Sequence, residues 1–316
     1  MIATFKNFGP YASGVQVELD SADPSITIID GVATLGDVAS GALADTSADP
    51  FTIEISSGAQ TGSIADLTLH ATSAGGDTWS DLALLIGRFD YLVWDPTDDQ
   101  SSGPVIAATL ADRQYTGALR QTLPIDRLDD YATLWVSLGV YAENYVVDSD
   151  GNEGPAIVAF MNNGGNVYLE GADVWAYDPQ LGGFDFAPHF SLGATQDGTG
   201  DLYHVVGVAG TIADGMDFLY VGENSFIDHL QPVANGVALL GNSAPAYTCG
   251  VAGDTGTYRT VGASFELGGL DDGVGPSTKA DLARVIMDFF GVAPKDPLFA
   301  DGFETGDASA WSAGIP

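Results

Sequence analysis

The stretch Phe89-Asp90-Tyr91-Leu92-Val93-Trp94 decides the fold of the larger part of this chain. It is a nearly continuous apolar run, which is typical of a strand that is covered on both faces. Similar runs follow at residues 133–138 and 166–169, and a helix pattern precedes each of these two runs. Strands that alternate with helices predict right-handed βαβ units and a parallel sheet.

Residues with known preferences mark the ends of the helices. Ser101 and Ser102 offer an N-cap for the first helix, and Pro155 opens the second, which ends at Gly164-Gly165. A last helix, capped by Ser277 or Thr278 and ended by Gly291, is the clearest element of the chain. Its apolar residues recur on one helical face, at Leu282, Val285, Ile286, Phe289 and Phe290.

Two other parts of the chain predict mostly strands. Residues 1–87 carry apolar residues in alternation with polar ones, as in Val15, Val17 and Leu19, with turn signals between the runs. This period-two pattern indicates a β-sandwich. After residue 200, strands are predicted at residues 203–208, 217–221, 237–240, 247–251 and 260–265.

The charge of the chain restricts its partners. Nine Lys and Arg residues stand against 43 Asp and Glu residues, for a formal net charge of −34 over 316 residues. Such a surface repels nucleic acid and anionic membranes and attracts divalent cations, of which Ca²⁺ prefers hard oxygen ligands. No apolar stretch is long enough to span a membrane, and the N-terminal residues do not form a signal peptide. The chain instead begins in what looks like a strand, so we interpret the sequence as a fragment of a longer protein.

Three stretches resemble known families. Residues 1–87 resemble the Ig-like repeats of large bacterial exoproteins, in the residues Asn7-Phe8-Gly9, Gly14-Val15, Ser21–Asp30 and Gly36. Residues 89–291 resemble a flavodoxin-like or class I glutamine-amidotransferase-like domain found near the C-termini of secreted bacterial peptidases. The segments that carry this second resemblance are Asn163–Gly171, Gly207–Gly210, Gly222–Asn224, Ile227–His229 and Ser264–Gly273. The tail, from Asp301–Asp307 to Trp311-Ser312, looks like a C-terminal motif of exported Gram-negative proteins.

The second resemblance implies a test for catalysis. A catalytic amidotransferase-like domain places a Cys at a sharp turn between a strand and a helix, with a His later in the chain. Here the strand Val167–Leu169 continues into Glu170-Gly171-Ala172-Asp173, and no Cys is present at that point. The chain is therefore expected to hold or present other molecules rather than to cleave them, and no catalytic residue is assigned.

The carboxyl ends of parallel strands are the usual ligand site in such a fold. Residues that follow the predicted strands could bind a cation, a sugar or a peptide amine there: Asp95, Glu170, Asp173, Trp175, Glu223, Asp228 and His229. The alternative interpretation is that these acids are ordinary turn residues of an acidic protein. In a binding module, Trp94, Trp175 and Tyr177 would be exposed beside the acids.

Two further features of the sequence could be functional groups. Asp148, Asp150 and Asn152 alternate as in the start of a Ca²⁺ loop, but Ala159 stands where an EF-hand needs Glu, so a looser calcium turn and a plain solvated turn both remain open. The single cysteine, Cys249, lies in a strand-like run and is interpreted as a core residue. A hydrolase that uses Cys249, or Asp228 with His229, remains an alternative.

The sequence therefore predicts three parts: an Ig-like β-sandwich (1–87), a flavodoxin-like three-layer α/β domain with extra strands (88–293), and a linker with a sorting-type tail (294–316). We interpret the chain as a non-catalytic accessory region of a secreted or cell-surface bacterial hydrolase, in particular a peptidase. The alternatives are a Ca²⁺-dependent adhesin or carbohydrate- or protein-binding module, and an extracellular fibre subunit. Expected partners are the parent catalytic domain, an extracellular protein or glycan, or another copy of the chain. No cofactor other than Ca²⁺ is indicated, and neither nucleic acid nor a membrane span is expected.

Overall fold

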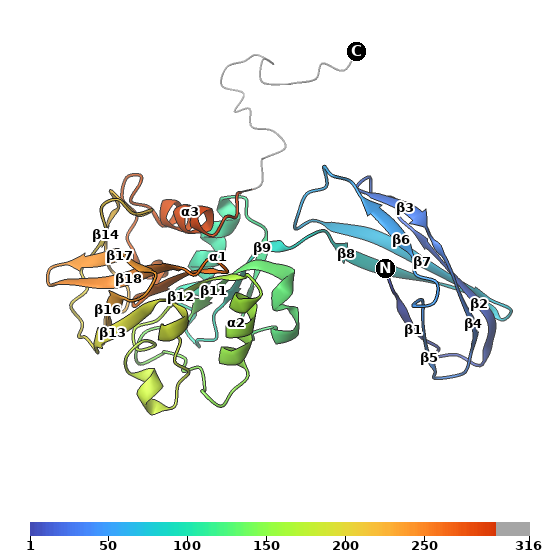
Figure 1. Cartoon of the computed structure of the whole chain (residues 1–316), viewed down its shortest axis with the longest axis horizontal. Coiled ribbons are helices and arrows are strands. Elements are labelled where there is room, and N and C mark those ends of the chain that lie inside the picture. The colour runs from blue at the N-terminus through green and yellow to red at the C-terminus, as the bar shows by residue number, and fades with distance from the viewer. Residues whose placement is uncertain (295–316) are drawn as a thin grey trace, which may run out of the picture. The chain divides into compact units, whose positions relative to one another are not determined.

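The computed structural model describes residues 1–294, so the predicted tail beyond Ala293 lies almost wholly outside the described residues. The chain divides into two compact units, Met1–Arg88 and Phe89–Pro316, and the predicted boundary at residues 87 and 88 is next to this division. Figure 1 shows the elements of both units.

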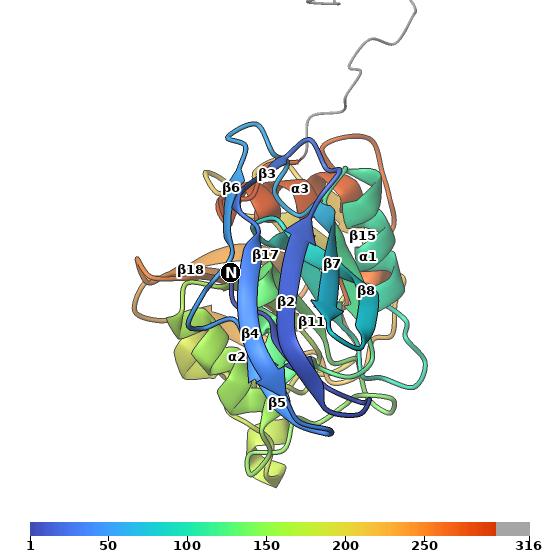
Figure 2. The same ribbon diagram turned by 90° about the vertical axis from the view of Figure 1, so that its right-hand side faces the viewer.

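The first unit consists of β-strands. Four of them form an antiparallel sheet in the order β4-β2-β7-β8, which Figure 2 shows side by side: β4 (Val32–Val38), β2 (Ala12–Asp20), β7 (Ile64–Ser73) and β8 (Gly76–Leu85). Two shorter pairs complete the unit: β1 (Thr4–Lys6) with β5 (Leu43–Asp45), and β3 (Ile26–Asp30) with β6 (Thr52–Ile55).

The predicted alternation in this unit is confirmed by burial. Val17 is fully buried and Leu19 nearly so, whereas Gln16 and Glu18 between and beside them are exposed. These apolar side chains share one core with Phe51 and with the inner residues of β7. Period-two patterns mark half-buried strands because successive side chains point to opposite faces.

The second unit is built on one large mixed sheet with helices on both faces. Its main path runs β10-β9-β11-β12-β19-β18-β17-β14-β15, and β16 joins β18 while pairing with β13. The strands β9, β10, β11, β12 and β19 are mutually parallel, and the strands from β18 onward are antiparallel. Their bounds are β9 (Phe89–Trp94), β10 (Gly117–Arg120), β11 (Tyr131–Ser137), β12 (Asn166–Glu170), β13 (Leu192–Gln196), β14 (His204–Gly207), β15 (Asp217–Leu219), β16 (His229–Pro232), β17 (Gly236–Ser243), β18 (Ala246–Asp254) and β19 (Arg259–Ala263).

Up to residue 294, three α-helices cover the sheet. α1 (Gly103–Asp112) and α3 (Lys279–Phe289) share one apolar cluster with one face of the sheet, and α2 (Glu153–Asn162) packs in the cluster on the other face (Figure 1). Short 3₁₀ helices lie at η1 (Ile125–Asp130), η2 (Asp178–Leu181), η3 (Ala187–His189) and η4 (Leu267–Gly269). The prediction of parallel strands alternating with helices is confirmed, and the unit is an α/β structure.

Burial explains the unbroken apolar run that opens this unit. Leu92, Val93 and Trp94 are all fully buried, although successive residues face opposite sides of the sheet. Leu92 and Trp94 pack in the cluster that contains α2, while Val93 packs in the cluster that contains α1 and α3. A strand needs apolar residues at every position only when both of its faces are covered.

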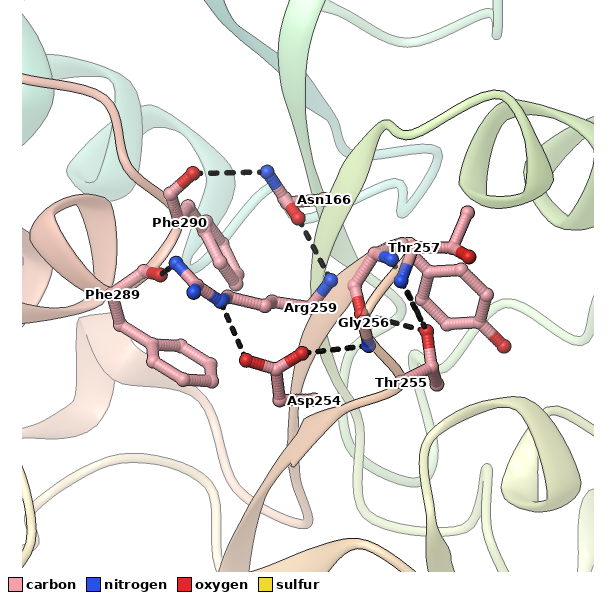
Figure 3. A network of polar contacts seen from close by, with 9 residues as sticks. Asn166, Asp254, Thr255, Gly256, Thr257, Arg259, Phe289 and Phe290 are labelled. Carbon is pink, nitrogen blue, oxygen red and sulfur yellow. Dashed lines mark hydrogen bonds and ion pairs between the residues drawn. The ribbon is translucent and has the colours of Figure 1, made fainter.

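A polar network holds the end of α3 to the start of two central strands (Figure 3). The guanidinium of Arg259 donates to the carbonyl of Phe289 at 2.5 Å and to Asp254 at 2.8 Å, and it lies 5.3 Å from the ring centre of Phe289. Asn166 accepts from the backbone N–H of Arg259 at 2.8 Å and donates to the carbonyl of Phe290 at 3.1 Å. These bonds satisfy carbonyls at the C-terminal end of α3 that have no partner within the helix.

In the described part of the chain, no helix has both the length and the apolar character that a membrane crossing requires.

Candidate functional site

The five parallel strands of the second unit end at the same edge of the sheet, and four of these ends carry buried polar residues. β9 lies between β10 and β11, so the chain leaves β9 toward one side through α1 and later returns to its other side. In an open α/β sheet, ligands bind at such a switch point, outside the carboxyl ends of the strands. Polar residues stand at or just beyond the four strand ends, namely Asp95, Ser137, Glu170 and Glu266. We call these residues, with Ser101 and Ser102, the carboxyl-edge cluster.

Glu170 is the centre of this cluster and is fully buried. Its carboxyl group accepts hydrogen bonds from the hydroxyl of Ser137 at 2.9 Å, the hydroxyl of Tyr168 at 2.7 Å and the backbone N–H of Leu267 at 2.7 Å. Burial raises the pKa of Glu170 to about 7, although its hydrogen bonds, with Ser102 the largest contributor, act in the opposite direction. The carboxyl group thus ties the ends of β11 and β12 to the segment that follows β19.

Glu266 is the second buried carboxyl group of the cluster, and its side chain accepts a hydrogen bond from Ser101. Burial, followed by the charge of Glu170, raises its pKa to about 7. Two buried carboxyl groups disfavour each other's ionised form, because both charges would have to be held in a poorly solvated place. Glu266 is not among the predicted ligand residues, although it directly follows the predicted strand at residues 260–265, and that position is the signal that could have identified it.

Asp95, and not a serine, caps the first helix. Its Oδ2 accepts from the backbone N–H of Gly103 at 2.9 Å, and its Oδ1 accepts from the backbone N–H of Thr97 at 3.0 Å. Ser102 occupies the predicted N-cap position, but its hydroxyl makes no capping bond to the helix and instead accepts from the backbone N–H of Gly268 at 2.9 Å. A Cβ on Gly103 would overlap the Asp95 side chain, so glycine permits this close approach.

The last residue of β12 is a carboxylic acid, Glu170. Leu169 is followed by the enclosed Glu170, and the lone cysteine lies elsewhere, in β18. Cys249 is fully buried in the apolar cluster beneath α1 and α3, and burial raises the pKa of its thiol well above the ordinary value. A thiol in such surroundings is not poised to form the thiolate that a nucleophile requires.

A second group of acids lies in the loop after β12 and at the start of β16. Asp228 is fully buried, and its Oδ2 accepts from the backbone N–H groups of Trp175 at 3.0 Å and Ala176 at 2.9 Å. Burial raises the pKa of Asp228 to about 8, that of Asp173 to about 7 and that of Asp178 to about 6. Within residues 1–294, the other oxygen of Asp228, Oδ1, is buried without a hydrogen-bond partner.

The predicted ligand residues thus divide into separate groups. Asp95 and Glu170 belong to the carboxyl-edge cluster, whereas Asp173 and Asp228 belong to the second group. Glu223 is exposed and contributes its backbone carbonyl, which accepts from Tyr220 at 2.8 Å. His229 stacks on Tyr247, with ring centres 3.7 Å apart and planes inclined by 11°.

The expected exposure of the aromatic residues is wrong for two of the three. Trp94 is fully buried, and Trp175 is only 4% exposed, with its indole N–H donating to the carbonyl of Ala263 at 2.9 Å. Tyr177 is 44% exposed, as expected. Each indole ring has a large apolar area, and burial of this area favours a position in the core.

The predicted calcium turn has a local structure of its own. Oδ1 of Asp148 accepts from the backbone N–H of Asp150 at 2.8 Å, and the carbonyl of Asp148 accepts from Gly151 at 3.0 Å. Asn152 immediately precedes α2, without a capping side-chain bond. Among the described residues, no three His, Cys, Asp or Glu side chains are arranged to hold a metal ion.

Comparisons with known proteins give no family for the chain. No protein-family model matches it, and no curated protein matches it in sequence. Among solved structures, the mmIFT52 N-terminal domain is similar at 10% identity and a TM-score of 0.45, over 66% of this chain and 100% of that domain. A ThuA-like protein from Bacteroides uniformis is similar at 11% identity and a TM-score of 0.42, over 64% of this chain and 90% of that one.

Proposed function

We propose that the chain is a non-catalytic accessory region of an exported, secreted or surface-held bacterial hydrolase, in particular a peptidase, in which it spaces or docks the catalytic domain. In this proposal the first unit is an Ig-like sandwich and the second is a flavodoxin-like, three-layer domain related to class I glutamine amidotransferases. The high acid content supports an extracellular location.

One observation carries the proposal: the environment of Glu170 at the end of β12. A nucleophile at this position would need an exposed reactive atom and a base beside it. Glu170 instead has no exposed surface, and its carboxyl group is bonded to Ser137, Tyr168 and the Leu267 N–H. These bonds join the ends of β11 and β12 to the segment after β19, as expected of a residue with a structural role.

Buried carboxyl groups with a pKa near 7 also occur in acid–base catalysis, so the cluster requires a direct test. A general acid or base must come within about 3 Å of the substrate atom whose proton it transfers. Glu266 is only 3% exposed and already accepts from Ser101, which leaves little of its surface for a substrate.

The test is an assay of the purified chain against fluorogenic peptide, ester and glycoside panels. The expected result is no turnover above that of Glu266→Gln and Glu170→Gln variants prepared in the same way. Turnover that is present in the wild type and lost in a folded Glu266→Gln variant would overturn the proposal. In the full-length parent hydrolase, deletion of this region is expected to leave kcat unchanged and to lower thermal stability or substrate affinity.

A second candidate is a calcium-dependent binding module, which the alternation of Asp148, Asp150 and Asn152 favours. Asp148 and Asp150 are exposed and could turn toward a cation, as Ca²⁺ requires several oxygen ligands. Calorimetry with CaCl₂ tests this candidate. Heat that is absent, or that is unchanged in an Asp148→Ala, Asp150→Ala variant, would remove it.

A further inference from the structure

The outward face of the four-stranded sheet carries an aromatic residue among carboxylates. The strand register places Trp79 of β8 opposite His70 of β7, and His70 opposite Glu18 of β2. Residues directly opposite each other in a sheet point to the same face, and so do residues two positions along each strand. We call the following six residues the Trp79 face: Glu18, Asp20, His70, Asp77, Trp79 and Asp81.

The Trp79 ring is exposed and is held in a fixed orientation. The side chain is 61% exposed, and its indole lies parallel to the His70 imidazole, with ring centres 3.8 Å apart and planes inclined by 4°. His70 is itself fixed by Asp77, whose carboxylate lies 3.1 Å from its Nε2. The stack covers one side of the indole and leaves the other side open. An open indole face attracts a Lys or Arg side chain through its ring electrons.

The charge around this ring indicates the sign of the ligand. Asp77 and Asp81 lie two positions before and after Trp79 on the same strand face, and both are exposed. Residues 1–88 contain eleven Asp and Glu residues, and their only Lys and Arg residues are Lys6 and Arg88. Such a surface repels another copy of the same acidic chain and attracts a cationic partner.

The strand that carries Trp79 lies at the end of its sheet. β8 pairs with β7 over ten consecutive residue pairs without a register shift, and within the first unit it has no strand on its other side. The opposite edge of the sheet is different, because β4 pairs with β2 through two register shifts. Irregular pairing protects an edge from strand addition, whereas a regular edge is a template for it. β8 also contains neither Pro nor Lys, the residues that commonly block an edge.

We propose that β8 and the Trp79 face bind a basic, extended segment of a partner protein. The segment adds as a strand along β8 and places an Arg or Lys side chain against the open indole face. Its neighbouring basic residues, two positions away on the same face, lie opposite Asp77 and Asp81. Because side chains alternate between the two faces of a strand, basic residues at every second position of the segment have the same spacing as Asp77, Trp79 and Asp81 on β8. The proposal concerns the first unit alone and does not depend on the function proposed for the second.

The test uses the full chain and short synthetic peptides in which Arg and Val alternate, with a control peptide that has Glu in place of Arg. Calorimetry is expected to detect binding of the Arg peptide and no binding of the Glu peptide. The affinity for the Arg peptide is expected to fall as salt is added. Trp79→Ala should weaken binding about three- to thirtyfold, the range expected for a cation on an indole. Trp79→Phe should have an intermediate effect, and an Asp77→Asn, Asp81→Asn variant should weaken binding and reduce its dependence on salt.

Matched controls separate this site from general charge attraction. Phe8→Ala removes another exposed aromatic ring of the same unit, and Glu54→Gln removes another exposed carboxylate; both should bind the peptide as the wild type does. Circular dichroism of each variant checks that the fold is retained. A peptide N-methylated at alternate residues along one edge removes the donors needed for strand addition, and one of the two edge-methylated forms should fail to bind.

Any one of four outcomes would overturn the proposal. The first is that the Arg and Glu peptides bind equally well, or that neither binds. The second is that the folded Trp79→Ala variant binds the Arg peptide with unchanged affinity. The third is that both N-methylated peptides bind fully. Binding of a neutral oligosaccharide to Trp79 in place of the Arg peptide would also overturn it, and would assign the ring to a glycan.

Discussion

The carboxyl group of Glu170 accepts a hydrogen bond from the backbone N–H of Leu267 at 2.7 Å, although 97 residues separate the two in the chain. The bond joins the end of β12 to the 3₁₀ turn that follows β19. The surrounding donors, Ser137 and Tyr168, make the carboxyl group a structural centre.

Replacing Glu170 by Ala should destabilise the second unit severely. Three donors would lose their buried acceptor, and a single buried polar group left unpaired costs about 1–3 kcal/mol. We expect a loss of about 3 kcal/mol or more in the free energy of unfolding, measured by urea denaturation. Glu223→Ala is the control, since this exposed side chain should contribute less than about 0.5 kcal/mol. A Glu170→Ala variant as stable as this control would contradict the structural role.

Stability should decrease as the pH rises from about 4 to about 8. Burial raises the pKa values of Glu170, Glu266 and Asp173 to about 7 and that of Asp228 to about 8, from ordinary values of 4.5 for Glu and 3.8 for Asp. The folded state then binds more protons than the unfolded state between these limits, so the free energy of unfolding falls as pH rises through them. Thermal melts at pH 5 and pH 8 measure the difference.

General repulsion among the many acids would change stability in the same direction, so a variant is required. Asp228→Asn cannot ionise, yet its amide oxygen can still accept from the Trp175 and Ala176 N–H groups. It should flatten the dependence of the melting temperature on pH, whereas Glu223→Gln should leave the profile as it is. Equal profiles for all three proteins would refute the assignment to Asp228.

Replacing Arg259 by Met should loosen the network in Figure 3. The variant loses the bond to the Phe289 carbonyl and the contact with its ring, while the half-exposed ion pair with Asp254 contributes little. We expect a loss of about 1–2 kcal/mol in the free energy of unfolding. Arg284→Met, which breaks an exposed pair with Asp288 on α3, should cost less than about 0.5 kcal/mol. Similar losses in both variants would show that the network has no special role.

Cys249 should not react with Ellman's reagent in the native protein. The thiol is fully buried and its pKa is raised, so both access and thiolate formation are suppressed. Reaction with one equivalent should appear only in denaturant. Rapid labelling of the native chain would restore Cys249 as a candidate nucleophile.

Trp175→Ala should behave as a core substitution and not as the loss of a ligand contact. Its ring packs against Phe190, with ring centres 5.2 Å apart, and truncation of a buried Trp costs about 3–5 kcal/mol. Tyr177→Ala, which removes the neighbouring exposed aromatic ring, should leave stability within about 0.5 kcal/mol of the wild type. Chemical denaturation of both variants gives the comparison. An unchanged stability for Trp175→Ala would contradict its place in the core.

The periodicity of apolar residues predicted the strands and helices that are buried along a whole face. The run at Phe89–Trp94 and the helical face of α3 were both visible, because burial selects apolar residues at a fixed period. The short strand β10 was not predicted, since Gly117–Arg120 is too brief to show a period. Its first residue is glycine because a Cβ there would overlap the Tyr91 carbonyl oxygen, a contact that only the paired strands reveal.

The sequence by itself determined the strand-rich first unit, the alternating strands and helices of the second, and the acidic surface, because these depend on local patterns and on composition. Only the tertiary structure decided which polar residues meet. It brought Glu170 to Leu267 and Asp228 to Trp175, and it buried Trp94 and Trp175, which had been expected at the surface. Such pairings depend on how loops that are far apart in the sequence fold over the strand ends, and the spacing of residues along the chain does not predict which loops meet.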